Sequence, residues 1–316
     1  MEPPACPIEV RPPAWGEARR AADLYVRLPA VPGAYEAAAA TVESNQRNQV
    51  VAVRGGQIVG SCLFVPSAGR CAIVLAPRLA SWDEPLAARL LRAAAARAYR
   101  RGARLIQSLT EPQDRGPAPP GRSPVARALE AAGFDVLAEL SYMRRPVPLA
   151  ERDWPLPPAV QWRGYSRLRH RRFADTITAT YEGSLDCPGL AGLRTADEAI
   201  ATHKTTGRFS PDAWHVASVD GRPAGVELLS AIEARTELVY LGVVPAMRGR
   251  GLGRVLLGRA IRDTARMAIP TIGLAVDVRN TPAIRLYGGM GFREIRRRLA
   301  WFVPRDRLAQ FDAAPE

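Results

Sequence analysis

The part of this sequence best suited to chemistry is a glycine-rich basic turn that follows an apolar run. Residues 237–244 form the apolar run, and residues 248–253 read Arg-Gly-Arg-Gly-Leu-Gly. Glycines at every second position allow several backbone N–H groups to converge on an anion at the positive end of a following helix. Arg248, Arg250 and Arg254 add positive charge at the same place. The turn is therefore predicted to bind phosphate groups.

Two other glycine-rich phosphate loops are excluded by spacing. The P-loop requires Gly, four residues and then Gly-Lys-Ser/Thr, but Lys204 is the only lysine in the chain. The dinucleotide fingerprint requires Gly-x-Gly-x-x-Gly followed about 20 positions later by an acidic residue. Here Gly249, Gly251 and Gly253 recur at every second position. Neither pattern fits.

A second motif follows the turn and identifies a family resemblance. The apolar run 271–278 precedes Asn280, Ala283, Tyr287 and Gly291-Phe292. Together with Arg-x-x-Gly-x-Gly in the turn, this order and spacing resemble the two signatures of the GCN5-related N-acetyltransferases (GNAT). The resemblance implies direct transfer of an acetyl group from acetyl-CoA to a primary amine. A covalent enzyme intermediate is not expected, because no cysteine lies beside either motif.

The resemblance places a general base at Glu237, eleven positions before Arg248. An acceptor ammonium with a pKa of ~8 to ~10.4 must lose a proton before its nitrogen can attack. The side chain is expected to share a strand face with Val239 and Leu241, unless a bulge near Gly242 resets the alternation. An alternative interpretation pairs this carboxylate with a nearby arginine such as Arg235. Two other acids, Glu227 and Asp277, are competing candidates for the base.

Tyr287 is implied as the acid that protonates the departing thiolate, and its alternative role is ordinary aromatic packing. Asn280 is implied as a cofactor contact and is equally compatible with a role as helix cap, with Thr281 as a second candidate N-cap. The strand before the turn is implied to pair with pantetheine. The complete set of implied cofactor-binding residues is Leu241, Gly242, Val243, Arg248, Gly249, Arg250, Gly251, Leu252, Gly253, Arg254 and Asn280.

The acceptor side is less clearly encoded. Residues 181–193 lie where the family's variable helix and loop shape the acceptor pocket. Within this segment, the carboxylates of Glu182 and Asp186 can hold an ammonium group. A surface loop without a binding role is the alternative interpretation.

The chain reads as an internal duplication. Residues 53–63 (VRGGQIVGSCL) match residues 219–229 (VDGRPAGVELL). A proline-rich stretch at 145–158 predicts a linker between a degenerate GNAT-like domain at 1–150 and a catalytic GNAT domain at 151–316. Residues 77–85 of the first copy have no glycine cradle and contain two acids, so this copy is predicted to have lost or greatly weakened pyrophosphate binding.

The expected fold class is α/β (α+β), with two tandem GNAT-like domains, each a mixed, mostly antiparallel sheet flanked by helices. Strand patterns alternate with period two and helical patterns repeat with period 3.6. Expected strands cover 50–53, 58–64, 71–76, 104–108, 160–165, 214–219, 224–232, 237–244 and 271–278. Expected helices cover 86–99, 124–132, 168–181 and 195–203, and another begins at Leu252.

Composition limits the possible partners. The formal net charge is +13, which is consistent with an anionic ligand such as a CoA thioester. Nucleic acid is not the expected partner, because the basic runs at 167–172 and 296–298 carry no recognised reader motif. Cys6, Cys62, Cys71 and Cys187 form no Cys-x-x-Cys pair, and the three histidines have no metal-ligand spacing, so no metal is expected. No signal peptide or membrane span is recognised, which predicts a cytoplasmic protein with reduced thiols.

Two functions remain as alternatives to acetylation of an unspecified small-molecule or peptide amine. The tandem arrangement is similar to that of mycothiol synthases, which acetylate the cysteinyl amine of a thiol sugar. The second alternative is a module that binds or senses acyl-CoA without transferring the acyl group. Glu237 and Tyr287 favour an enzyme over a sensing module.

Overall fold

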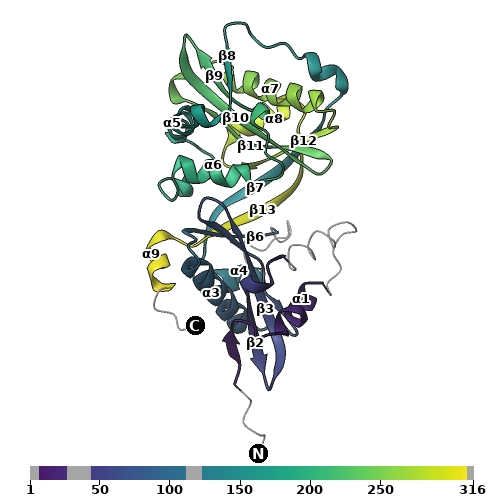
Figure 1. The fold of residues 1–316 in the computed structure, drawn as a ribbon, viewed down its shortest axis with the longest axis vertical. Helices are drawn as coiled ribbons and strands as arrows, with labels where there is room; N and C mark the ends of the chain where they lie inside the picture. The colour runs from purple at the N-terminus through teal and green to yellow at the C-terminus, as the bar shows by residue number, and fades with distance from the viewer. Residues whose placement is uncertain (1–6, 27–43, 112–122, 312–316) are drawn as a thin grey trace, which may run out of the picture. The chain divides into compact units, whose positions relative to one another are not determined.

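The computed structural model describes residues 7–26, 44–111 and 123–311, so Cys6 and the N-terminal start lie outside the described residues. The chain forms two compact units (Figure 1). Unit 1 comprises Met1–Leu137 and Leu299–Glu316, and unit 2 comprises Ala138–Arg298. Each unit contains a mixed sheet flanked by helices, which confirms the expected fold class. No helix within the described ranges is both long and apolar enough to cross a membrane.

The sheet of unit 1 is antiparallel except where β4 and β6 run parallel. Its strands, in spatial order, are β1 (Glu9–Arg11), β2 (Gln49–Arg54), β3 (Gln57–Ser67), β4 (Cys71–Val74), β6 (Leu105–Thr110) and the end of β13 (Arg293–Phe302), with β5 (Arg78–Leu79) paired to β3. Its helices are α1 (Glu17–Val26), α3 (Glu84–Arg100), α4 (Pro124–Ala131) and α9 (Arg305–Leu308). The apolar face of α3, including Leu90 and Leu91, is fully buried against Phe64 and Trp301.

The sheet of unit 2 is also antiparallel except at one place, where β11 and β12 run parallel. Its strands, in spatial order, are the start of β13, β7 (Asp135–Pro146), β12 (Thr271–Asp277), β11 (Arg235–Val243), β10 (Arg222–Ile232), β9 (Trp214–Val219) and β8 (Gln161–Gly164). Its helices are α5 (His170–Tyr181), α6 (Ala196–Lys204), α7 (Leu252–Arg266) and α8 (Thr281–Gly289).

Helices cover both faces of the central strands of unit 2. Phe173 and Ile177 of α5 pack with Val226 and Leu228 of β10 on one face. On the other face, apolar residues of α7 pack with alternate positions of β10, β11 and β12; they include Leu257, Ala260, Leu229, Leu238, Ile272 and Leu274. The period-two strand pattern and the helical pattern therefore combine in a three-layer unit, as the sequence predicted.

The last strand of each repeat lies in the other repeat's unit. β7 ends the first repeat, yet its residues 140–146 pair with β12 inside unit 2. β13 ends the second repeat, yet its residues 299–302 pair with β6 inside unit 1. The compact units therefore differ from the linear division at residue 150. We retain 1–150 and 151–316 only as the proposed extents of the sequence repeat.

The proline-rich stretch expected to be a linker is built into unit 2. Pro146 is the last residue of β7, and a 3-10 turn covers Leu149–Asp153. Trp154 then packs so closely on α7 that a Cβ on Gly258 would lie 2.6 Å from its Nε1 atom. Proline at this density therefore ends a strand and shapes a packed turn here.

Local details differ from the sequence expectations for identifiable reasons. α5 begins at His170 because Arg167–Arg169 form a 3-10 turn that leaves Leu168 98% exposed. β9 covers Trp214–Val219 as expected, and the Asp220-Gly221 turn has left-handed φ values of 50° and 75°. The sequence correctly marked this hairpin, because Asp and Gly tolerate positive φ.

Candidate active site

The main feature of unit 2 is that two of its central strands stop pairing before they end, and we call this unpaired region the wedge. β11 and β12 pair only at Thr236↔Ile272 and Glu237↔Gly273. Both strands then continue, β11 to Val243 and β12 to Asp277. On its other side, β11 stays paired with β10 as far as Val243. The side of β11 that faces the wedge at Leu241–Val243 therefore has no β12 partner and can accept an extended ligand as an added strand.

A bulge in β11 determines on which face of the sheet each of its side chains lies. The register with β10 steps from Leu228↔Tyr240 to Leu229↔Leu238, so Val239 is an extra residue in β11. Val239 and Tyr240 consequently both pack on the α5 side, whereas Leu238 and Leu241 pack on the α7 side. The expectation that Glu237 and Leu241 share a face is therefore wrong, because the bulge reverses the alternation between them.

The glycine turn opens into α7 as a cradle of backbone donors. Gly249 and Gly251 have left-handed φ values of 74° and 80°, and neither would place a Cβ within 4 Å of another group. Gly251 is the N-cap of α7, and no side chain caps this helix. Among the described backbone hydrogen bonds, none uses the N–H groups of residues 249–251. This combination of turn and uncapped helix start is suited to binding phosphate oxygens.

The cradle is fixed by packing behind it. Leu252 is buried in the core between α7 and the sheet. A Cβ on Gly253 would lie 3.2 Å from Leu286 of α8, so this glycine permits close packing of the two helices. Arg250 and Arg254 are exposed and remain candidates for phosphate contacts.

Arg248 also has an internal role. Its Nε donates to the carbonyl of Val243 at 3.1 Å, and its Nη1 and Nη2 donate to the carbonyls of Gly183 at 3.2 Å and Thr180 at 3.0 Å. The guanidinium therefore connects the start of the cradle to the end of α5. Sequence reasoning counted its charge toward phosphate binding and missed this role, because the three acceptors are backbone groups distant in sequence.

Asn280 and Tyr287 belong to α8, on the other arm of the wedge. The Asn280 side chain accepts a hydrogen bond from the Ala283 N–H at 3.3 Å and is the N-cap, so the alternative cap at Thr281 is wrong. Tyr287 is 7% exposed, and its ring packs 5.9 Å from that of Phe292. Burial raises the pKa of Tyr287, so the phenol is neutral in the physiological range.

Glu237 lies at the closed end of the wedge. A Cβ on Gly273 would be 2.8 Å from its Oε2 atom, so the carboxylate occupies the space above this glycine. Its side chain is 19% exposed and forms an ion pair of 3.4 Å with Arg235. Burial raises the pKa of Glu237, although Arg235, Arg144 and Arg296 oppose that shift. A carboxylate with a raised pKa is suited to general-base catalysis.

The two competing acids are engaged elsewhere. Glu227 is fully buried, and its Oε1 lies 2.8 Å from Nδ1 of His215. Asp277 is fully buried and accepts hydrogen bonds from Nη2 of Arg279 at 2.6 Å and from the N–H of Cys187 at 3.1 Å. Of the three carboxylates, only Glu237 is both partly exposed and located at the wedge.

The fold also assembles a buried His–Glu–Asp group that the sequence spacing did not reveal. Ligand atoms of His215, Glu227 and Asp263 lie within 4.8 Å of one another. However, the guanidinium of Arg259 lies 2.9 Å from Nε2 of His215 and 2.7 Å from Asp263. Because a guanidinium only donates, Nε2 accepts, and the neutral ring carries its proton on Nδ1 toward Glu227. This tautomer forms a hydrogen-bond network and leaves neither ring nitrogen available to a metal.

The corresponding helix start in unit 1 is chemically different. Asp83 caps α3 by accepting from the N–H of Leu86 at 2.9 Å, and the preceding residues Arg78–Leu79 form β5 against β3. A carboxylate thus takes the place where the cradle of unit 2 offers donors.

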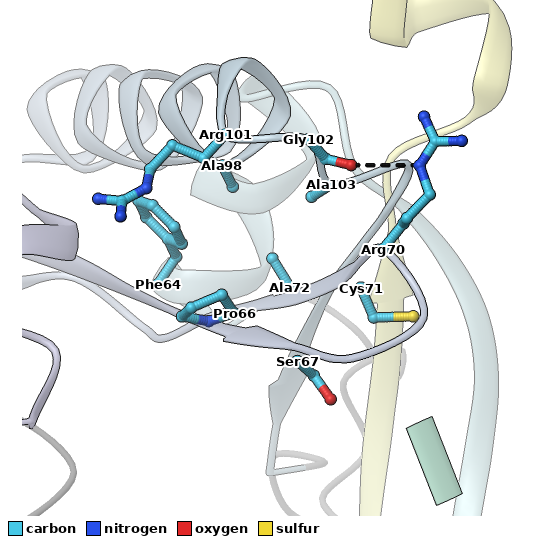
Figure 2. A pocket seen from close by; sticks show the side chains of 10 residues that line it. All are labelled: Phe64, Pro66, Ser67, Arg70, Cys71, Ala72, Ala98, Arg101, Gly102 and Ala103. Atoms are coloured by element: carbon cyan, nitrogen blue, oxygen red, sulfur yellow. Dashed lines mark hydrogen bonds between the residues drawn. The ribbon is translucent and has the colours of Figure 1, made fainter. Parts of the chain in front are cut away.

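A pocket in unit 1 lies at the end of α3, opposite the Asp83 cap. It measures about 380 Å³ and is lined by the start of β4 and the end of α3 (Figure 2). The Nε atom of Arg70 donates to the carbonyl of Gly102 at its rim, at 3.5 Å. Because the cradle of unit 2 forms at the start of its helix, this pocket is not the counterpart of the cradle.

Comparison with known proteins agrees with this geometry. Residues 178–292 match the model of a family described as Acetyltransferase (GNAT) family. The matched segment therefore belongs to the GNAT family. The GNAT match contains the cradle, the wedge, Glu237 and Tyr287.

Two solved structures share the fold of this chain. A GCN5-related N-acetyltransferase from Sphaerobacter thermophilus aligns with a TM-score of 0.58 and 17% identity, over 93% of this chain and 95% of that one. A tandem GNAT protein from the clavulanic acid biosynthesis pathway aligns with a TM-score of 0.52 and 15% identity, over 94% and 98% of the two chains. Both likenesses support a tandem GNAT architecture.

Sequence relatives of this chain include mycothiol acetyltransferases. That of Streptomyces griseus subsp. griseus is 31% identical over 176 residues, covering 54% of this chain and 56% of the relative. That of Thermomonospora curvata is 30% identical over 211 residues, covering 60% and 65%. The chain therefore spans less than two thirds of the length of these relatives.

Proposed function

We propose that this protein is an N-acetyltransferase that transfers an acetyl group from acetyl-CoA to the cysteinyl amine of a small thiol compound of the mycothiol type. The wedge beside the cradle, where α7 begins without a side-chain cap, is the observation that carries the acetyltransferase part. The similarity to mycothiol acetyltransferases favours the cysteinyl amine over an unspecified amine.

The residues of unit 2 divide the chemistry among themselves. Backbone donors at 249–253 bind the pyrophosphate of the acetyl donor, and the edge at Leu241–Val243 pairs with its pantetheine arm. Glu237 takes a proton from the amine, directly or through water. As the new C–N bond forms and the C–S bond breaks, Tyr287 gives a proton to the departing sulfur. Each residue can then exchange its proton with solvent before the next turnover.

A neutral phenol with a raised pKa is a weak acid, so its contribution depends on position. Tyr287 has no hydrogen-bond partner among the residues that the structure describes, which leaves its hydroxyl available to a ligand. A donor held beside a thiolate stabilises the developing charge even before proton transfer is complete. This role differs from the alternative of simple packing, which needs only the ring.

The test uses purified full-length protein with acetyl-CoA and cysteinyl-glucosamine, and with the analogue that lacks the amine. Products are identified by mass spectrometry, because the thiol of the acceptor interferes with assays of released CoA thiol. We expect N-acetylation of the amine compound alone. Binding of acetyl-CoA without acetylation of cysteinyl-glucosamine or any other amine in a panel would instead support the acyl-CoA-sensing alternative.

A further inference from the structure

The segment between α5 and the short turn at Pro188 is attached to both arms of the wedge. On the β11 arm, the carbonyl of Gly183 accepts from Nη1 of Arg248 at 3.2 Å. On the β12 arm, the N–H of Cys187 donates to Oδ2 of Asp277 at 3.1 Å. In return, Oδ1 of Asp186 accepts from the N–H of Asp277 at 2.9 Å. Residues 183–187 therefore bridge the strands where they are apart.

These contacts hold the Asp186 carboxylate in a defined orientation. Asp277 is itself held by the backbone N–H of Arg279 at 2.9 Å and by the Arg279 side chain, which also contacts both carboxylate oxygens. Cys187 adopts a left-handed φ of 45°, which turns the segment at this point. The second oxygen of Asp186 has no partner among the described residues, and the residue is exposed. One oxygen is thus anchored while the other is available.

Asp186 also lies near the predicted acid. Burial is the largest cause of the raised pKa of Tyr287, and the negative charge of Asp186 raises that pKa further. The same carboxylate contributes to the raised pKa of Tyr240 on β11. Because the charge of Asp186 acts on tyrosine hydroxyls of both arms, its carboxylate lies at the wedge.

On one face of β12, only small side chains lie between two carboxylates. Gly273, Ala275 and Asp277 alternate on the face of β12 opposite α7. Glu237 lies over Gly273, Ala275 is exposed, and Asp277 is bonded to Asp186. Four residues of strand span about 13 Å. Water over this part of the strand can carry the proton from an ammonium group held at Asp186 to Glu237.

We propose that Asp186 binds the ammonium form of the acceptor at the mouth of the wedge and thereby selects cationic amines. This inference rests on the proposed acetyltransferase function and assigns a specificity-determining residue to it. The other carboxylate of the segment, Glu182, is exposed and has no hydrogen bond or ion pair among the described residues. It therefore lacks the anchoring that orients Asp186.

The experiment compares Asp186→Asn with Glu182→Gln as a matched control, using cysteamine and cysteinyl-glucosamine as acceptors. Loss of a charge-assisted hydrogen bond is expected to raise the KM of the amine at pH 7 by about tenfold to a hundredfold. The kcat and the KM of acetyl-CoA should change less than about threefold. The increase should shrink above the pKa of the amine, where the acceptor is neutral, and Asp186→Glu should restore part of the affinity.

Each alternative outcome has a separate meaning. An unchanged amine KM in Asp186→Asn, with the wild type active, overturns this inference and leaves the proposed function intact. A wild type that binds acetyl-CoA but neither binds nor acetylates the two amines overturns both. If Asp186→Asn does not fold, Asp186→Ser retains an acceptor for the Asp277 N–H and provides the same comparison. An increase confined to Glu182→Gln would assign the role to that residue and overturn the proposal.

Discussion

Glu237 and Tyr287 show how the same physical cause has opposite chemical effects. Burial is the largest influence on both, and it raises the pKa of each. A raised pKa makes a carboxylate a stronger base, whereas it makes a phenol a weaker acid. Glu237 is therefore adapted to its proposed role by its environment. Tyr287 depends on its position on α8, the helix that follows β12.

Arg144 is expected to tune the base. It pairs with Gly273, which in turn pairs with Glu237, so the three residues form one row across β7, β12 and β11. Arg144→Ala removes a positive charge that lowers the pKa of Glu237, so that pKa should rise further. A base with a higher pKa remains protonated to higher pH. The acid limb of kcat/KM should therefore move to higher pH in a pH–rate profile.

Arg171 supplies a matched control for this experiment. It is an exposed arginine of α5 that pairs with Asp175 at 3.2 Å. Arg171→Ala should leave the acid limb in place. Equal shifts in the two variants, or no shift in Arg144→Ala, would disprove the assignment of this limb to Glu237.

Tyr287→Phe is expected to separate binding from chemistry. The ring retains its packing against Phe292, while the proton donor is lost. General acid–base catalysis contributes about 10²- to 10⁴-fold, so kcat should fall by about 10²-fold or more. The Kd of acetyl-CoA, measured by calorimetry, should change less than about twofold. An unaltered kcat would eliminate Tyr287 as the acid, and a comparable loss of affinity would indicate a packing role.

At the scale of elements, the starts of α3 and α7 explain why the repeats differ. Both helices follow the fourth strand of the repeat motif, and both pack on the sheet through an apolar face. α3 is capped by Asp83, whose carboxylate repels an anion and uses a backbone donor. α7 begins with a left-handed glycine and has no side-chain cap. Because of this difference between an acidic cap and exposed donors, we expect phosphate binding at the start of α7 and not at the start of α3.

Gly251→Ala tests the cradle, with Gly102→Ala as its control. Both glycines have left-handed φ values, of 80° and 95°, and open space at the Cβ position. Each substitution should lower the free energy of unfolding by about 1 kcal/mol, because alanine is strained there. Only Gly251→Ala places a methyl group on the phosphate-binding surface. Its acetyl-CoA Kd should rise at least about tenfold by calorimetry, while equal affinities in both variants would refute the cradle.

At the scale of the whole molecule, the repeats have exchanged their last strands while only one has kept the cradle. β7 contributes Arg144 to the row that contains Glu237, so the first repeat supplies part of the site in unit 2. This observation gives a structural reason for retaining a degenerate repeat. Residues 138–146, the end of the first repeat, should therefore not be dispensable for the activity of the second copy.

The number of acetyl-CoA molecules per chain tests the difference between the repeats. We expect calorimetry of the full chain to give one site, because Asp83 caps the helix start in unit 1. Gly251→Ala should weaken this single site without revealing another. A stoichiometry of two would show that unit 1 binds the donor by a different route.

Short-range patterns determined much of this protein directly from its sequence. The cradle at 248–253 and the hairpin at Asp220-Gly221 depend on backbone conformations that a few adjacent residues impose. The sequence left the cap of α8 open between Asn280 and Thr281. The sheet-and-helix organisation of both repeats was likewise predictable, because hydrophobic periodicity is a local signal.

Only the tertiary structure decided the features that depend on distant partners. These include the bulge at Val239, the internal role of Arg248, the strand exchange, and the anchoring of Asp186 by Asp277. Each requires contact between residues whose separation in sequence carries no periodic signal. Sequence therefore determined which groups were available for chemistry, whereas long-range strand pairing and packing determined which of them meet at the wedge.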